Sequence, residues 1–96
     1  MRHAPIALRP VLSATSEYFG VNPFAKTRRH RVVTARMIVT NYLMRNNNIT
    51  NAMMCDIFNI PHTQVIYYLN RHDELMETNE VYRNHYLNFK QFLFNL

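Results

Sequence analysis

Glycine is nearly absent from this chain of 96 residues, which contains one glycine and four prolines. That composition argues against a sheet protein with many tight turns, and the frequent Met, Leu, Ala and Asn residues favour helices. A single glycine also cannot supply the Gly-x-x-x-x-Gly-Lys-Ser/Thr loop that holds nucleotide phosphates. We therefore expect a helical protein that binds no nucleotide.

Cysteine is equally scarce, because Cys55 is the only one. One cysteine excludes an intrachain disulfide and a zinc finger, and its place on an apolar helical face predicts a buried thiol. No run approaches the ~20 apolar residues of a membrane span, and residues 1–25 lack the continuous apolar segment of a signal peptide. These absences lead us to expect a cytoplasmic protein with no metal site and no membrane association.

Arrangements of residues that would support catalysis are missing as well. Asp73 and Glu74 are adjacent, so their side chains point in different directions on a helix and make a poor acid and base pair. Neither Ser13 nor Ser16 has a histidine at a spacing that would bring the two side chains together. His62 and His72 have no carboxylate or thiolate at ligand spacing on the same helical face. We therefore expect neither an enzyme nor a protein with a cofactor.

Positive charge, in contrast, is abundant and unevenly distributed. The formal net charge is +5. Residues 1–50 contain eight Lys or Arg against one Glu, whereas residues 51–96 contain three against five Asp or Glu. Six cationic side chains, counting His30, fall within residues 26–36. A polyanion is the natural partner of such a cluster, although an idle basic surface would have the same composition.

Hydrophobic residues make up 48% of the chain and include six Phe and six Tyr, so one core can form without a metal or disulfide. No repeat or long linker divides the sequence. We expect residues 1–96 to form one domain in which residues 1–5 are frayed. Apolar residues at helical spacing predict a compact all-α bundle of about five helices. The predicted helices cover residues 8–19, 32–45, 51–58, 61–76 and 79–95.

Residues near the ends of these segments support the boundaries. Gly20 follows the last apolar residue of the first helix and is placed to cap it. Thr50 is a suitable N-cap for the third helix, and Asn59 can take the left-handed conformation in the next turn. Pro61 stands at the expected first position of the fourth helix, where its missing N–H costs nothing. Residues 50–76 therefore predict a helix-turn-helix.

The second helix of that unit begins with residues suited to reading bases in the major groove of DNA. Thr63 can offer a hydroxyl and a methyl contact, Gln64 can bind adenine with two hydrogen bonds, and His62 can donate to guanine. Tyr67 shares the outward face, and Thr50 flanks the unit. A plain helical hairpin in a bundle would have the same spacing, so the motif does not decide the function alone.

Residues 21–31 predict a connector that ends in a basic arm. Cationic side chains of this kind bind phosphates and make affinity depend on salt, and an arginine from an arm can enter a narrow minor groove. A solvated charge run or an RNA-binding patch is the alternative. The predicted DNA-binding residues in and after the connector are Lys26, Arg28, Arg29, His30, Arg31 and Arg36.

Several of these segments together resemble the C-terminal DNA-binding domain of the bacterial replication initiator DnaA. The resemblance covers roughly residues 8–76. The stretch from Arg28 to Ile38 is similar to that family's passage from a basic loop into a helix. The stretch from His62 to Val65 partly matches its Asp-His-Thr-Thr-Val recognition motif. Shorter similarities occur at Tyr18-Phe19-x-Val21 and, shifted by one residue, at Tyr42-Leu43-x-Arg45.

The resemblance implies a small helix-turn-helix domain that binds double-stranded DNA in the bacterial cytoplasm or nucleoid. Arg28 matches the family's minor-groove arginine, His62 and Thr63 match two readers of the major groove, and Arg36 matches the arginine that opens the long helix. Pro61 stands where the family has its base-reading Asp, so the implied similarity concerns architecture rather than target sequence. With no ATPase part in the chain, a replication or transcription regulator from a phage or mobile element fits best.

The C-terminal helix is richer in aromatic residues than a single helix needs. We expect Tyr86, Phe89 and Leu93 in the core and leave the places of Phe92 and Phe94 open. An uncovered aromatic patch would serve a homodimer or another protein partner. The alternative function is therefore a helical protein-interaction module, such as an assembly or anti-host factor.

Overall fold

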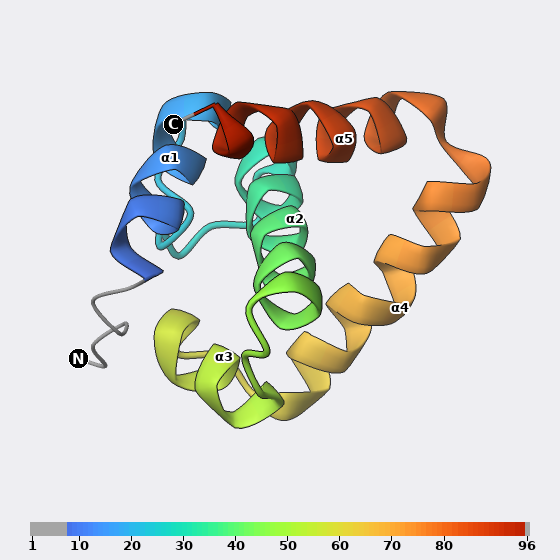
Figure 1. The fold of residues 1–96 in the computed structure, drawn as a ribbon. Coiled ribbons are helices and arrows are strands. Elements are labelled where there is room, and N and C mark those ends of the chain that lie inside the picture. Colours follow the sequence, from blue (N-terminus) through green and yellow to red (C-terminus); the bar gives the residue numbers. More distant parts are fainter. Residues whose placement is uncertain (1–7, 96) are drawn as a thin grey trace.

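The computed structural model describes residues 8–95, and these residues form five α-helices (Figure 1). The all-α fold class expected from the sequence is confirmed, whereas the expected fraying of residues 1–5 lies outside the described residues. Among residues 8–95, no helix is both long and apolar enough to cross a membrane. The helices are α1 (Arg9–Phe19), α2 (His30–Asn46), α3 (Asn51–Phe58), α4 (His62–Thr78) and α5 (Glu80–Phe94).

Helix α2 is the centre of the bundle. Helices α1 and α4 pack against it, α5 crosses one end and contacts both α1 and α4, and α3 lies toward the other end beside α4 (Figure 1). The fully buried apolar side chains of the helices come from α2, α3, α4 and α5 and belong to the faces that the spacing predicted. They are Ala35, Ile38, Val39 and Leu43 of α2, Met54 of α3, Val65 and Tyr68 of α4, and Phe89 of α5.

The predicted caps are confirmed. Gly20 has a left-handed backbone with φ of 66°, and its N–H donates to the carbonyl oxygen of Ser16 at 2.9 Å. Thr50 accepts the N–H of Met53 on its hydroxyl oxygen at 3.2 Å, which satisfies one free donor at the start of α3. Asn59 is left-handed as well, with φ of 55°. Asn59 opens the turn of three residues between α3 and α4.

The helix starts differ from the predicted positions by one residue for α1, α4 and α5 and by two residues for α2. Helix α2 begins at His30, because the hydroxyl oxygen of Thr27 accepts the N–H of Arg29 at 3.2 Å and turns the chain into the helix early. Pro61 is the N-cap of α4 rather than its first residue. Its ψ of 161° is extended, and its carbonyl oxygen accepts the N–H of Gln64 at 3.0 Å.

The aromatic side chains of α5 divide between core and surface. Tyr86 and Phe89 are buried as expected. Phe92 is half-buried, with its ring centroid 5.4 Å from that of Tyr18 in α1. Phe94 is 84% exposed. Most of the aromatic stripe therefore holds α5 on the bundle, and only its last residue projects from it.

The single thiol was expected to be buried and is only half-buried. Cys55 lies in the middle of α3, and its Sγ donates to Oδ1 of Asn51 at 3.4 Å. Burial is the larger cause that raises the pKa of the Cys55 thiol, and the nearby Asp56 adds to it. A raised pKa disfavours the reactive thiolate.

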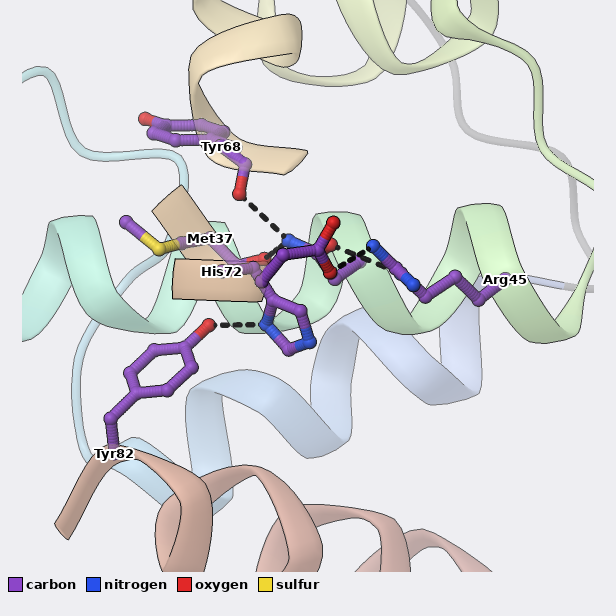
Figure 2. A network of polar contacts seen from close by, with 7 residues as sticks. Met37, Arg45, Tyr68, His72 and Tyr82 are labelled. Carbon is purple, nitrogen blue, oxygen red and sulfur yellow. Dashed lines mark hydrogen bonds and ion pairs between the residues drawn. The ribbon is translucent and has the colours of Figure 1, made fainter. Parts of the chain in front are cut away.

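A buried polar network fixes α4 across α2 (Figure 2). Asn41 is fully buried, and its Nδ2 donates to the carbonyl oxygens of Met37 at 2.9 Å and Tyr68 at 3.1 Å. Nε of Arg45 donates to Oδ1 of Asn41 at 3.3 Å, and Nη2 of Arg45 pairs with Asp73 at 2.7 Å. Because an unpaired buried amide is costly, these bonds favour one placement of α4 on α2.

The same network reaches α5 through a buried histidine. His72 is 3% exposed, and a hydrogen bond of 2.6 Å joins its Nδ1 to the hydroxyl of Tyr82 (Figure 2). Burial, and to a smaller extent the charge of Arg45, lower the pKa of His72 to about 4 against the opposite effect of Asp73. Burial also raises the pKa of Tyr82. Both side chains therefore stay neutral in the folded protein near pH 7.

We predict that stability falls as the pH is lowered from about 6.5 to about 4, the unfolded and folded pKa values of His72. In this window the unfolded chain binds a proton that the folded protein excludes, so acid favours unfolding by up to ~2–3 kcal/mol. Urea unfolding of the wild type and of His72→Gln across this range measures the effect. The variant should lose most of the pH slope, and an unchanged slope would contradict this assignment.

Candidate nucleic-acid interface

The first turns of α4 present a set of exposed polar side chains. His62, Thr63, Tyr67 and Asn70 are exposed, and Gln64 is half-buried. The opposite face of the helix is buried against the core, as the spacing predicted. Within residues 8–95 these five side chains make no hydrogen bond to the protein, so their donors and acceptors remain available to a ligand.

Charge along α4 separates into two halves. Residues 62–72 contain no acidic side chain, and the N-terminus of the helix has no side-chain cap. The acidic residues lie further along, where Asp73 pairs with Arg45 and Glu74 pairs with Arg71. The start of α4 therefore combines free backbone N–H groups with an absence of negative charge, which suits an approaching phosphate.

The basic arm is exposed throughout. Lys26, Arg28, Arg29, His30 and Arg31 all lie at the surface, and none of them forms an ion pair within the described part of the chain. The last two belong to the first turn of α2, which contains no acidic residue. Cations at the positive end of a helix repel the helix dipole. An anion bound there would relieve that repulsion.

Arg36 ties this arm to α4. Its guanidinium donates to the carbonyl oxygens of Pro23 at 2.9 Å and Ala25 at 2.5 Å, and to the hydroxyl of Tyr68 at 3.3 Å. The side chain therefore bridges α2, the connector and α4. The sequence predicted Arg36 as a DNA-binding residue, whereas here its guanidinium is half-buried and engaged with the protein.

A contact between two tilted aromatic rings holds the connector at a second point. The ring centroid of Phe24 lies 5.2 Å from that of Phe58, the last residue of α3. The carbonyl oxygen of Asn22 accepts the N–H of Ala25 at 3.1 Å and shapes the connector into a turn. Together with Arg36, this contact places the start of the arm beside the turn between α3 and α4.

Thr50 lies at the start of α3, away from the three-residue turn. It is exposed, and its hydroxyl oxygen is engaged with the N–H of Met53. Its O–H group remains able to donate. The structure therefore gives Thr50 a defined capping role beside its predicted role as a flanking contact.

Two features of this region were not predicted from the sequence. Ile66 is 49% exposed on the outward face of α4, and its spacing of three residues from Thr63 could have identified it. A cleft of about 590 Å³ also opens beside the arm, and His30, Arg31, Tyr67 and Arg71 contribute to its lining. No sequence signal predicts this cleft, because its walls come from four helices that are distant in the chain.

Within residues 8–95 no group of three His, Cys, Asp or Glu side chains could hold a metal ion. A comparison of the chain with family models, with curated proteins and with solved structures found no match. What the arm and α4 can bind is therefore inferred from their geometry and not from similarity to known proteins.

We predict that Arg36→Gln releases the arm, because the substitution removes the charged donors that hold the connector. Trypsin should then cleave between residues 26 and 31 about tenfold faster, which corresponds to a loss of ~1.4 kcal/mol in the cost of local opening. Limited proteolysis followed by mass spectrometry measures the rate. Arg9→Gln, which removes an exposed cation at the start of α1, is the matched control. Equal cleavage rates in all three proteins would show that Arg36 does not hold the arm.

Proposed function

We propose that this protein binds double-stranded DNA, with the start of α4 in the major groove and the basic arm along the adjacent backbone and minor groove. The observation that carries the proposal is the bridge from Arg36 to Pro23, Ala25 and Tyr68. It attaches a strongly cationic segment to α4, whose first turns are exposed, polar and free of acidic residues. Both parts can then contact one duplex.

The chemistry at the start of α4 suits sequence-specific contacts. His62, Thr63 and Gln64 supply donors and acceptors that can meet base edges, and Ile66 adds an apolar surface for a thymine methyl group. The turn between α3 and α4 has three residues, a length found in DNA-binding helix-turn-helix units. We therefore propose that these four residues set the sequence preference.

The arm supplies affinity. Four exposed cations beside one another would neutralise phosphates and release counterions, so binding should weaken steeply with salt. Arg28 lies in the connector, before the start of α2, and is the residue proposed to enter the minor groove. Arg36 takes a different part from the one that the sequence suggested. It positions the arm and need not touch DNA.

This arrangement agrees with the resemblance to the DNA-binding domain of DnaA, and we propose a divergent form of that architecture. Tyr18, Phe19 and the segment from Arg28 to Ile38 carry the similarity. A non-enzymatic regulator of replication or transcription, encoded by a phage or mobile element, is the role that we propose for a domain of this kind.

The second candidate function is protein interaction through α5. Val81 is 67% exposed, Leu87 48% and Phe94 84% on this helix. These side chains are separated along α5 rather than joined to the buried stripe, so we rank a protein partner or homodimer below DNA.

We predict that selection from random duplexes at moderate salt enriches one short motif for the wild type. Thr63→Ala combined with Gln64→Ala should retain weak binding that depends on salt and should enrich no motif, because phosphate contacts carry no sequence information. Sequencing of the bound pools measures both results. If the wild type enriches no motif, and if α5 variants alter its association with a protein, the second candidate function is favoured.

We predict different effects for two arginines of the arm. Arg28→Ala should weaken binding to the selected duplex by ~1–3 kcal/mol and relax preference at its contact position, whereas Arg31→Ala should reduce the salt slope by about one. Mobility-shift titrations at several salt concentrations measure both effects. Lys90→Ala removes an exposed cation of α5 and is the control. If the control weakens binding as much as either arm variant, the arm is not the contact surface.

A further inference from the structure

The cleft beside the arm has the size of a small-molecule site. Its volume is about 590 Å³, within the range of ~300–1,000 Å³ typical of such sites. The end of α1, the first half of α2, the middle and later turns of α4 and the start of α5 all contribute to its lining. A ligand there would contact four of the five helices.

Apolar side chains make up most of its inner wall. Met37 and Tyr82 are buried residues that reach this wall, and Phe19, Leu75 and Tyr18 are half-buried around it. The hydroxyl of Tyr82 is occupied by its bond to His72, so the tyrosine contributes its ring rather than a polar group. Such a wall suits an apolar group more than water.

The lining also contains two arginines. Arg31 and Arg71 contribute to it together with His30 and His85, and no Asp or Glu does. Nη2 of Arg31 donates to the carbonyl oxygen of Phe19 at 3.2 Å, and Nη1 of Arg71 pairs with Glu74. Each guanidinium therefore keeps further N–H donors, because only one nitrogen of each is engaged.

We propose that this cleft binds a small amphipathic carboxylate, with its apolar tail against the inner wall and its carboxylate between Arg31 and Arg71. The two arginines come from α2 and α4, so an anion would meet donors from two helices. A neutral apolar compound would leave these donors unused. A nucleic acid backbone would gain nothing from the aromatic wall. The proposal concerns the protein without DNA and does not depend on the proposed function.

The test uses two probes, 2-naphthylacetate and decanoate, which share the carboxylate and differ in an aryl or alkyl tail. Their neutral alcohols, 2-naphthaleneethanol and decanol, are the matched controls. The chain contains no tryptophan, so naphthyl fluorescence can be followed directly. Amide chemical shifts from a labelled protein locate the bound probe and report on decanoate. At least one carboxylate should bind ~10-fold more tightly than its alcohol and shift the amides of residues that line the cleft.

Exposed arginines allow variants that leave the fold intact. Arg31→Gln and Arg71→Gln should each reduce carboxylate affinity several-fold and leave binding of the alcohols unchanged. Lys90→Gln removes a cation outside the lining and should change neither. Tighter binding of the naphthyl or the alkyl acid decides the class of tail.

Three results would overturn the proposal. They are no binding of either acid at millimolar concentration, equal affinity for acid and alcohol, and shifts concentrated away from the cleft. Binding of an acidic peptide in the absence of binding by either small acid would likewise assign the surface to a protein partner and reject the small-molecule site.

Discussion

The arrangement of the candidate interface depends on the guanidinium of Arg36. Three hydrogen bonds from one half-buried side chain join the connector at Pro23 and Ala25 to Tyr68 in α4. Tyr68 is itself fixed, because its side chain is fully buried and its carbonyl oxygen accepts from Asn41 in α2. The start of the arm is therefore attached to the core and is not free to move. This attachment reduces the conformational entropy that is lost when the arm and α4 bind one ligand together.

Basic residues have two different roles in this small domain, as His72 and the exposed arm show. His72 is neutral and structural, since burial and the bond to Tyr82 connect α4 to α5. The arm instead contains several cationic side chains close to the start of α2. No acidic residue in the first turn of α2 neutralises them, and the helix dipole adds to their mutual repulsion. The buried face of α4 thus contributes stability, whereas both proposed ligands, a DNA backbone and a small carboxylate, would contact exposed cations of the arm.

Much of the fold could be predicted from residue spacing and local chemistry. The buried faces of α2 and α4 follow from apolar periodicity, and Gly20, Thr50 and Asn59 follow from capping preferences. The exposure of Thr63 follows from the burial of Val65 and Tyr68 on the same helix, whereas His62 is exposed as the first residue of α4. Long-range contacts were beyond that reasoning. The role of Arg36 depends on carbonyl groups 11 and 13 residues away and on a hydroxyl 32 residues away, and the cleft needs four helices to be placed first. The early start of α2 also came from a side-chain contact of Thr27 that no periodicity reveals.

The most direct test of the account is an amide chemical-shift map of the labelled protein with its selected duplex. One duplex should perturb residues 26–31 and residues 62–67 together, at the same titration midpoint, and leave the exposed face of α5 around Leu87 unchanged. Perturbation of only one of the two segments, or of α5 in their place, would contradict the claim that the arm and the start of α4 form a single DNA-binding surface.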